Sequence, residues 1–272
     1  MPFILMHAAC FALFWVKWSW TAVIVAAALY IIRMVTLSGF YHRYFSHRSF
    51  KTSRTMQFVF AVMGCSAAQK GPLWWAAHHR HHHQHSDDSE DIHSPHRDGF
   101  LWSHVGWVMS RQYFCTNINA VADLARYPEL IFLDHYDMLI PAVLACMLYG
   151  SGSALKFVIP SLNTSGPQML VWGFFISTVA LFHGTFTINS LSHLIGRQRF
   201  KTGDESRNSL LLALITFGEW HNNHHYYPTS ARQGFRWWEP DCTYMVLALL
   251  SILGLIWDLK TVPEHVAYAA GD

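Results

Sequence analysis

Histidine is the residue type whose number and spacing stand out in this chain. The sequence holds 19 histidines, as many as its lysines and arginines together. Three groups of them lie in polar stretches: HRYFSH from residue 42, HRHHH from residue 79 and HNNHH from residue 221. In the second and third groups histidines recur at i, i+3 and i+4, which places side chains on one face of a helix. Imidazole is a common ligand of iron, copper and zinc, so these groups predict metal binding.

The number of histidines indicates how many metal ions they hold. A single histidine is more often structural than a ligand, and a short histidine run can bind metal adventitiously. Three separate groups, two of them with the same spacing, are poorly explained by chance. Few carboxylates and no thiolates accompany them, which disfavours calcium, magnesium and iron–sulfur clusters. Structural zinc needs only four ligands, so at least eight available histidines predict two ions, while the spacing leaves the metal open.

Residues near these groups could support the metal ligands. Asn189 and His193 have the spacing i and i+4 at the end of an apolar stretch. Carboxylates often fix the tautomer of a ligating imidazole by accepting its second N–H. The candidates for this role, which the sequence does not rank and which could equally form a solvated surface, are Asp87, Asp88, Asp91, Glu205 and Glu219.

The elements that must position the histidines include several apolar stretches. The chain is 52% hydrophobic and only 13% charged, which is unusual for a soluble protein. Four stretches predict membrane-spanning helices, at approximately 3–16, 18–41, 138–158 and 169–192. The first is short for a span, and a signal peptide is the alternative for it. A further apolar segment, 56–75, contains polar residues, and we expect it to form an interfacial or re-entrant helix.

The distribution of positive charge predicts the orientation. Of the 19 lysines and arginines, 16 lie in 42–135 and 193–272, and cytoplasmic segments are enriched in these residues. We therefore expect a single domain over 1–272, an all-α multi-pass integral membrane protein. Its four transmembrane helices would form two hairpins, with a helical cytoplasmic cap that carries the histidine groups. No basic stretch is dense enough to follow nucleic acid, and the five scattered cysteines suggest no disulfide framework.

Read in order, these groups resemble the three histidine boxes of membrane fatty-acid desaturases, particularly the stearoyl-CoA (delta-9) type. The resemblance covers about residues 30–260. It includes the runs DIHSPH from residue 91, GF from 99, SHVGW from 103, NSLSH from 189 and FGE from 217. It implies a di-iron centre, with two Fe ions as cofactor, whose ligands are His42, His47, His79, His82, His83, His193, His221, His224 and His225, with Asn189 acting through a water. His78, His81 and His85 match no ligand position there, and His93 and His96 match the family in what we interpret as structural positions.

The resemblance also implies a substrate tunnel. Animal relatives line the bend of an acyl tunnel with a glutamine, a tryptophan and a threonine, and the similar positions here are Gln69, Trp75 and Thr185. Each has an ordinary alternative: an interfacial polar residue, an interfacial anchor and helix packing, respectively. Charged residues that help to hold CoA in animal enzymes are replaced by Ala76, Ala77 and His78. The expected substrate is a saturated acyl chain on CoA, or on a lipid.

The implied reaction is the O2-dependent introduction of a cis double bond at delta-9, with the metal site on the cytoplasmic side. Unactivated methylene groups resist side-chain acid–base chemistry, so the metal must supply the oxidant. No dinucleotide-binding motif is present. We therefore expect a separate electron donor, such as a ferredoxin or a cytochrome b5, besides the fatty-acyl substrate and the membrane lipid.

Two other functions fit parts of the pattern. A membrane di-iron hydroxylase acting on alkanes, sterols or lipids has similar boxes, and would add one oxygen rather than remove two hydrogens. A metal transporter needs polar ligands inside the spans. Here only His7 and His183 lie inside apolar stretches, each alone in its stretch, so this alternative is the less favoured.

Overall fold

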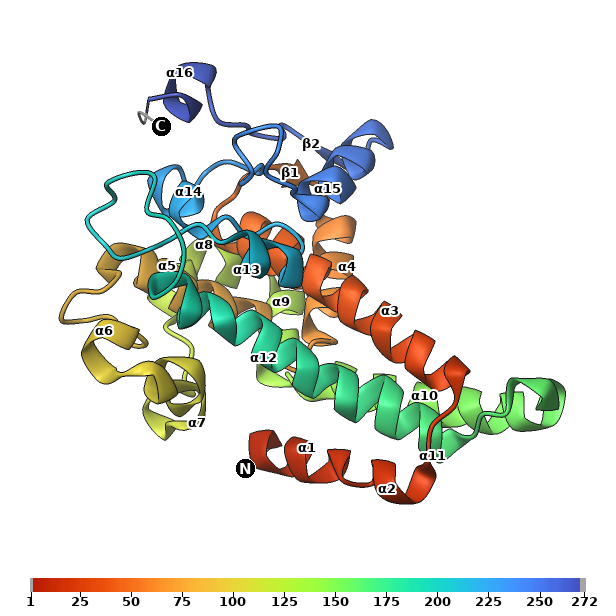
Figure 1. The fold of residues 1–272 in the computed structure, drawn as a ribbon. Helices are drawn as coiled ribbons and strands as arrows, with labels where there is room; N and C mark the ends of the chain where they lie inside the picture. Colours follow the sequence, from red (N-terminus) through yellow and green to blue (C-terminus); the bar gives the residue numbers. More distant parts are fainter. Residues whose placement is uncertain (1, 270–272) are drawn as a thin grey trace.

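The structure is a computed structural model that describes residues 2–269, and it is mostly helical (Figure 1). The longest elements are α3 (Trp20–Thr36), α10 (Leu139–Val158) and α12 (Ser177–Asn189). Two of them continue into or from π-helices: α3 runs into η1 (Leu37–Ser46), and η6 (Met169–Ile176) runs into α12. η6 packs against both α3 and α10, so these helices lie side by side (Figure 1). They form the apolar body of the protein.

Three helices among residues 2–269 are long and apolar enough to cross a membrane. They are Trp20–Ser46, Leu139–Val158 and Gly166–His193, with 27, 20 and 28 residues. The three longer predicted spans therefore correspond to real helices, and the second extends past its predicted end at residue 41. The segment predicted as the first span forms two short helices instead, α1 (Pro2–Cys10) and α2 (Leu13–Val16). Four spans in two hairpins and a cytoplasmic cap remain predictions.

Side chains and prolines mark where helices begin. The Ser19 hydroxyl accepts a hydrogen bond from the backbone N–H of Ala22 and caps α3. Ser53 caps α4 (Arg54–Cys65) in the same way, and Pro72 is the first residue of α5 (Pro72–His85), where its missing N–H costs nothing. The predicted interfacial segment 56–75 is thus α4, a turn and the start of α5, rather than one helix.

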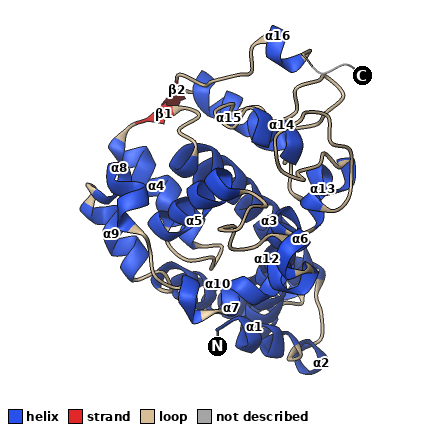
Figure 2. Ribbon diagram, turned by 90° about the vertical axis from the view of Figure 1, so that its left-hand side faces the viewer, coloured by secondary structure: helices blue, strands red, loops and turns tan. Residues whose placement is uncertain are grey.

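Shorter elements complete the polar part of the chain. Two short strands pair antiparallel, Lys51 opposite Trp257 and Thr52 opposite Ile256, and lie at the edge of the molecule (Figure 2). The remaining elements are β1 (Lys51–Thr52), α6 (Pro95–Asp98), η2 (Trp102–Gly106), α7 (Trp107–Met109), η3 (Arg111–Tyr113), η4 (Ile118–Val121), α8 (Ala122–Ala125), α9 (Pro128–His135), η5 (Pro160–Leu162), α11 (Gly166–Gln168), η7 (Leu191–His193), α13 (Leu210–Ile215), α14 (His221–Tyr226), α15 (Cys242–Ile252), β2 (Ile256–Trp257) and α16 (Glu264–Ala267).

The main hydrophobic core holds the histidine-bearing elements together. It joins buried residues of η1, such as Tyr41 and Phe45, to Phe60 of α4 and Leu73 of α5. η1 packs against α5, and η7 follows directly on α12. The two polar segments of the chain therefore meet at the same end of the long helices, where α5, α14 and the end of η1 come together (Figure 1).

Candidate metal centre and acyl cavity

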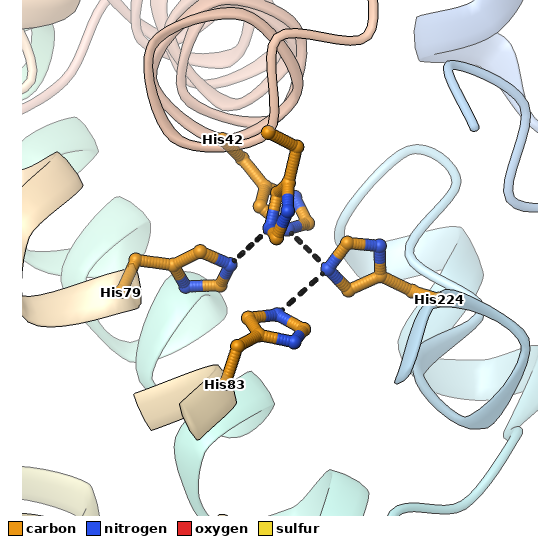
Figure 3. Close-up of side chains that lie close together, drawn as sticks. His42, His79, His83 and His224 are labelled. Atoms are coloured by element: carbon orange, nitrogen blue, oxygen red, sulfur yellow. Dashed lines mark hydrogen bonds between the residues drawn. The ribbon is translucent and has the colours of Figure 1, made fainter. Parts of the chain in front are cut away.

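Five histidines from distant parts of the chain face one another in a first group, called group A. They are His42 and His47 at the end of η1, His79 and His83 on α5, and His224 on α14. One ring nitrogen of each lies within 4.8 Å of one ring nitrogen of every other. Figure 3 shows the imidazoles of His79 and His83 pointing toward those of His42 and His224. The arrangement is that of ligands around one point.

The π-helix η1 explains why His42 and His47 both reach group A. Five residues along an α-helix turn a side chain about 140° past a full turn, onto a different face. In a π-helix residues i and i+5 are hydrogen-bonded neighbours instead. The backbone N–H of His47 donates to the carbonyl of His42 at 3.2 Å, and the two ring centroids are 5.0 Å apart. The local widening of the helix therefore turns both imidazoles to the same side.

A second group, called group B, contains His82, His193, His221 and His225. Their ring nitrogens also lie within 4.8 Å of one another. His82 comes from α5, His193 from η7, and His221 and His225 from α14. The nine histidines that the resemblance names as iron ligands are thus all brought together in two adjacent groups, five in one and four in the other. Their role as iron ligands remains a proposal.

Helices α5 and α14 each supply histidines to both groups. The i, i+4 pair of α5, His79 and His83, lies in group A, whereas the intervening His82 belongs to group B. On α14 the pair His221 and His225 lies in group B, and His224 belongs to group A. Each helix therefore contributes to both groups, and the rings of His83 in group A and His225 in group B lie 4.4 Å apart.

The chemistry of the donor atoms fits bound cations. The imidazoles of His42, His193 and His225 each donate Nδ1–H to a carboxylate, which leaves a lone pair on Nε2. His224 Nε2 lies 2.8 Å from His42 Nε2 and 2.9 Å from His83 Nε2, and one proton there can serve only one of these contacts. Among the described residues, the buried Nε2 of His225 has no hydrogen-bond partner. A metal ion is the group that satisfies several converging lone pairs.

Four carboxylates orient the histidines from behind. Glu219 accepts from His42 Nδ1 at 3.1 Å and Asp91 from His82 Nδ1 at 3.3 Å. Asp87 accepts from His193 Nδ1 at 2.8 Å, and Asp204 accepts from His225 Nδ1 at 2.6 Å. Three of these acceptors serve group B and one serves group A, and each fixes the tautomer of its ring and aims the Nε2 atom inward.

Three of these carboxylates were among the candidates from the sequence, and one was missed. Asp88 lies against His85 instead, and Glu205 pairs with Arg207. Asp204, the missed residue, also accepts hydrogen bonds from Thr202 and from the backbone and side chain of Ser206. The spacing of these neighbours resembles an ordinary polar turn, and only the fold places Asp204 beside a histidine.

Burial and neighbouring charges set the protonation states of the centre. Burial lowers the pKa of the His79, His83 and His224 imidazoles well below the usual value, and the surrounding imidazoles lower it further. Burial alone would raise the pKa of the Glu219 carboxyl, but His42, Arg43 and a Ser38 hydroxyl lower it to about 2. The histidines are therefore neutral and the carboxylate is charged near pH 7, the states that metal binding requires.

A cavity of about 210 Å³ extends from group A along α12. Gln69, Trp75 and Thr185, the residues that resemble the family's tunnel bend, all line it. Gln69 Nε2 donates to the Thr185 hydroxyl at 3.1 Å, so these side chains meet across the chain. The Trp75 ring stacks on His79 with centroids 5.0 Å apart. Asn189, expected to act through a water, also lines the cavity. An apolar space thus ends beside the histidine nitrogens.

Comparison with known proteins identifies the family. Residues 18–241 match the fatty acid desaturase family. This chain belongs to the fatty acid desaturase family. It is 38% identical to an sn-1 stearoyl-lipid 9-desaturase of Synechocystis over 90% of this chain and 74% of that protein. It is also 38% identical to a chloroplast palmitoyl-monogalactosyldiacylglycerol delta-7 desaturase of Arabidopsis thaliana, over 91% of this chain and 64% of the relative.

The relatives differ in substrate and in the position of the double bond. An acyl-CoA 5-desaturase of Anemone leveillei is 37% identical over 91% of this chain and 74% of that enzyme. These matches confirm that the chain is an oxidoreductase of the desaturase type, and its apolar helices agree with a membrane protein. They also confirm the resemblance to delta-9 desaturases. The names of the relatives divide between lipid-linked and CoA-linked substrates.

The other histidines of this desaturase lie around the centre. His96 Nε2 donates to the carbonyl of His193 at 2.8 Å, and the His93 ring lies 4.4 Å from that of His82. His81 Nε2 contacts the carbonyl of Glu90 at 2.9 Å and belongs to neither group. His78 lines the cavity. His85 lies beside Asp88.

Proposed function

We propose that this desaturase uses two iron ions, held by groups A and B, to introduce a cis double bond near the middle of a saturated acyl chain. The expected position is delta-9. The observation that carries the proposal is the convergence of nine histidines in two groups at one end of an apolar cavity. The acyl chain is carried as a thioester of CoA or an ester of a lipid, as in the names of the relatives.

The two groups differ in what they offer to a metal. Group A supplies five imidazoles and group B four, and Asn189 would complete group B through a water. When bound, a pair of iron ions supplies the O2-dependent oxidation that removes hydrogen from unactivated methylene groups. The protein's own contribution is to hold the imidazoles neutral and oriented, through the carboxylates behind them.

The cavity residues position the acyl chain for this reaction. The apolar walls exclude water from the reacting carbons and hold the chain in one place. Trp75, stacked on His79, keeps the chain beside group A. The contact between Gln69 and Thr185 forms a polar bridge at which the chain bends. A bent chain presents two neighbouring carbons in the conformation that leads to the cis product.

Electrons and topology complete the proposal. The electron donor is a separate protein such as a ferredoxin or a cytochrome b5. The protein spans the membrane four times with its metal centre on the cytoplasmic side. Cys115, which is exposed, tests the orientation. A membrane-impermeant thiol reagent added outside intact cells should leave Cys115 unmodified. Modification of Cys115 would show that the proposed orientation is wrong.

Three neighbouring histidines on α5 provide a matched test of the metal ligands. We expect His82→Ala and His83→Ala to lose bound iron and at least about 100-fold of the product, because each removes one ligand. His81→Ala, one residue away but in neither group, should keep both. The measurements are iron content of the purified protein and product formation with a reduced ferredoxin. Full iron binding by His83→Ala would contradict the proposed centre.

The substrate arms of the same assay separate the remaining alternatives. Purified protein receives O2, reduced ferredoxin and either saturated acyl-CoA or vesicles of saturated phospholipid or galactolipid. Mass spectrometry then distinguishes loss of two hydrogens from gain of one oxygen, and locates the double bond. If product forms from acyl-CoA alone or from the lipid vesicles alone, that result identifies the group that carries the acyl chain. An oxygenated product in either arm would replace desaturation with hydroxylation.

A further inference from the structure

Three histidines outside the metal centre form a continuous hydrogen-bonded chain. His7 on α1 and His183 on α12 were each alone in an apolar stretch of the sequence, but their Nε2 atoms lie 3.0 Å apart. His183 Nδ1 lies 3.0 Å from Nε2 of His104 on η2, whose Nδ1 lies 2.9 Å from the Ser190 hydroxyl. This chain, here named the histidine latch, joins α1 to α12 and η2.

The contacts of the histidine latch define one set of tautomers. His7 Nδ1 lies 2.8 Å from the carbonyl of Phe3, which can only accept, so His7 donates there and its Nε2 accepts. His183 must then donate from Nε2 and accept at Nδ1, and His104 must donate from Nε2. When the Ser190 hydroxyl turns its proton from the carbonyl of Phe186 to His104 Nδ1, every imidazole is satisfied while neutral. Because His183 uses its two nitrogens on different neighbours, the three rings do not converge on a single point as metal ligands do.

The element fastened in this way is a wall of the acyl cavity. Phe3 and Met6 of α1 line the cavity. The Phe3 ring lies 5.8 Å from that of Phe182 on α12, and Met6 packs in the apolar cluster that contains Phe174 of η6. The opposite side of α1 is exposed, with Ile4 58% and Leu5 66% accessible. A single helix therefore separates this part of the cavity from the surroundings.

Met6 lies at the end of the cavity that is away from the histidine groups. Along α12 and η6 the lining residues run from Asn189, near the histidines, back to Phe174. These residues are 15 positions apart, which corresponds to roughly 20 Å of helix. Met6 shares its apolar cluster with Phe174. It therefore lies where the methyl end of a chain threaded past group A would arrive.

α1 depends on such contacts for its position. A helix of nine residues is only marginally stable by itself. Inside lipid, the hydrophobic effect does not press such a helix against the rest of the protein, because the lipid tails are equally apolar. Packing and hydrogen bonds between helices then hold it in place. Within the described part of α1, His7 is the residue whose side chain makes a hydrogen bond to another element.

We propose that the histidine latch fixes α1 as the end wall of the acyl cavity, so that Met6 and the latch together determine which acyl chains are accepted. This inference rests on the proposed function of the cavity. His7, His183 and His104 are positioning residues, since they act on the substrate through α1. Met6 is the residue that meets the chain.

Four variants of α1 test this role, with matched controls. Met6→Ala enlarges the end of the cavity, whereas Leu5→Ala removes a similar side chain from the exposed face. His7→Ala breaks the latch, and His7→Gln keeps an acceptor for His183. Each purified variant is offered an equimolar series of saturated acyl chains of increasing length, with reduced ferredoxin and O2. The product ratio of long to short chains and the iron content are measured.

The expected result is a change of selectivity with iron content unchanged. One methylene more or less in an apolar pocket changes discrimination by about tenfold or more, so Met6→Ala should raise the long-to-short ratio by about that factor. His7→Ala should shift the ratio in the same direction, and His7→Gln and Leu5→Ala should keep that of the unaltered protein. Unchanged ratios in both Met6→Ala and His7→Ala would overturn the proposal.

A second measurement tests the latch without requiring any product. Cys10 lies on α1, and its Sγ donates to the carbonyl of Met6. Peptide mass spectrometry gives its rate of reaction with a small maleimide, with Cys146 on α10 as internal reference. His7→Ala should increase the Cys10 rate by at least about tenfold, and His7→Gln should not. If no chain is desaturated but Cys10 responds in this way, the proposed function fails while the latch stands; an unchanged Cys10 rate refutes the latch.

Discussion

Asp204 is the best place to test how the proposed metal centre is supported, because it contacts His225 and is not itself one of the proposed ligands. Its Oδ2 accepts from His225 Nδ1 at 2.6 Å. Its Oδ1 is held by Thr202 and Ser206. Burial alone would raise the pKa of the Asp204 carboxyl, but the hydrogen bond from His225 and its proximity hold that pKa well below its usual range. The carboxylate therefore stays charged and keeps the His225 proton on Nδ1.

The substitution Asp204→Asn should reverse the tautomer of His225. With Oδ1 kept by Thr202 and Ser206, the new amide places an N–H group opposite His225 Nδ1. Two donors repel, so the imidazole proton moves to Nε2, the atom that should bind the metal. A hydrogen bond to a charged acceptor contributes about 1.5–3 kcal/mol, which corresponds to a loss of roughly 10- to 100-fold in metal affinity or activity.

The assay compares iron content and product formation in purified variants. Glu205→Gln is the matched control, since the neighbouring Glu205 pairs with Arg207 rather than with a histidine. We expect Asp204→Asn to lose iron from one site first, and to lose at least about tenfold in product. Asp204→Asn with unaltered iron content and activity would refute the reasoning, because the carboxylate would then not control the His225 tautomer.

Three further predictions concern pH, metal and packing. Burial lowers the pKa of His225 from 6.5 to about 4 against the pull of Asp204, so the unfolded chain takes up this proton first. The metal-free protein should therefore lose stability, by on the order of 3 kcal/mol, as pH falls from 6.5 toward 4. In detergent, the unfolding temperature of His225→Gln should fall less steeply over this pH range than that of the unaltered protein. Removal of iron by a chelator should lower the unfolding temperature of the intact protein, and readdition should restore it, since binding stabilises only the folded state; equal unfolding temperatures would exclude a bound metal. At Gly71 an added Cβ would lie 2.3 Å from the Asp134 backbone, so Gly71→Ala should cost about 1–3 kcal/mol or more in thermal unfolding, while Gly150→Ala, with open space around it, should not.

The sequence was sufficient to predict which residues meet at the centre. Nine histidines were expected from their grouping and from the resemblance, and the structure gathers all nine. Gln69, Trp75 and Thr185 also meet at one cavity. The residues meet because the histidines lie in short segments of fixed spacing, and because three long apolar helices place the polar segments at one end. Their roles as metal ligands and tunnel residues stay predictions.

The assignment of each histidine to a group could not be predicted. An i, i+3, i+4 pattern puts three imidazoles on one face, but the orientation of that face relative to other elements decides which ring reaches which group. For this reason His82 lies in group B although the i, i+4 histidine pair of α5 lies in group A. His224 likewise lies in group A although the i, i+4 histidine pair of α14 lies in group B. The π-helix at His42 and His47 was also unpredictable, since hydrogen bonding of the i, i+5 type depends on tertiary packing as well as on sequence.

Contacts between distant polar residues were the other missing part. Asp204 lies 21 positions before its partner His225, and His7 lies 176 positions before His183. No periodicity connects such pairs. Each became visible only when the fold was known, and in both cases an apparently unremarkable residue has a specific hydrogen-bond partner.

Because α5 and α14 each supply histidines to both groups, the two groups depend on the same packing of these helices. Neither helix completes a group: α5 gives two histidines to group A and one to group B, and α14 gives one to group A and two to group B. Each group is completed only when the ends of α3 and α12, through η1 and η7, bring their own histidines to the same place. The proposed metal binding is then coupled to the packing of the long helices, because each group takes histidines from both halves of the chain. The first ion bound by either group should therefore align α5 and α14 for the other, so that loss of one ligand, such as His83, weakens the hold of the protein on both ions.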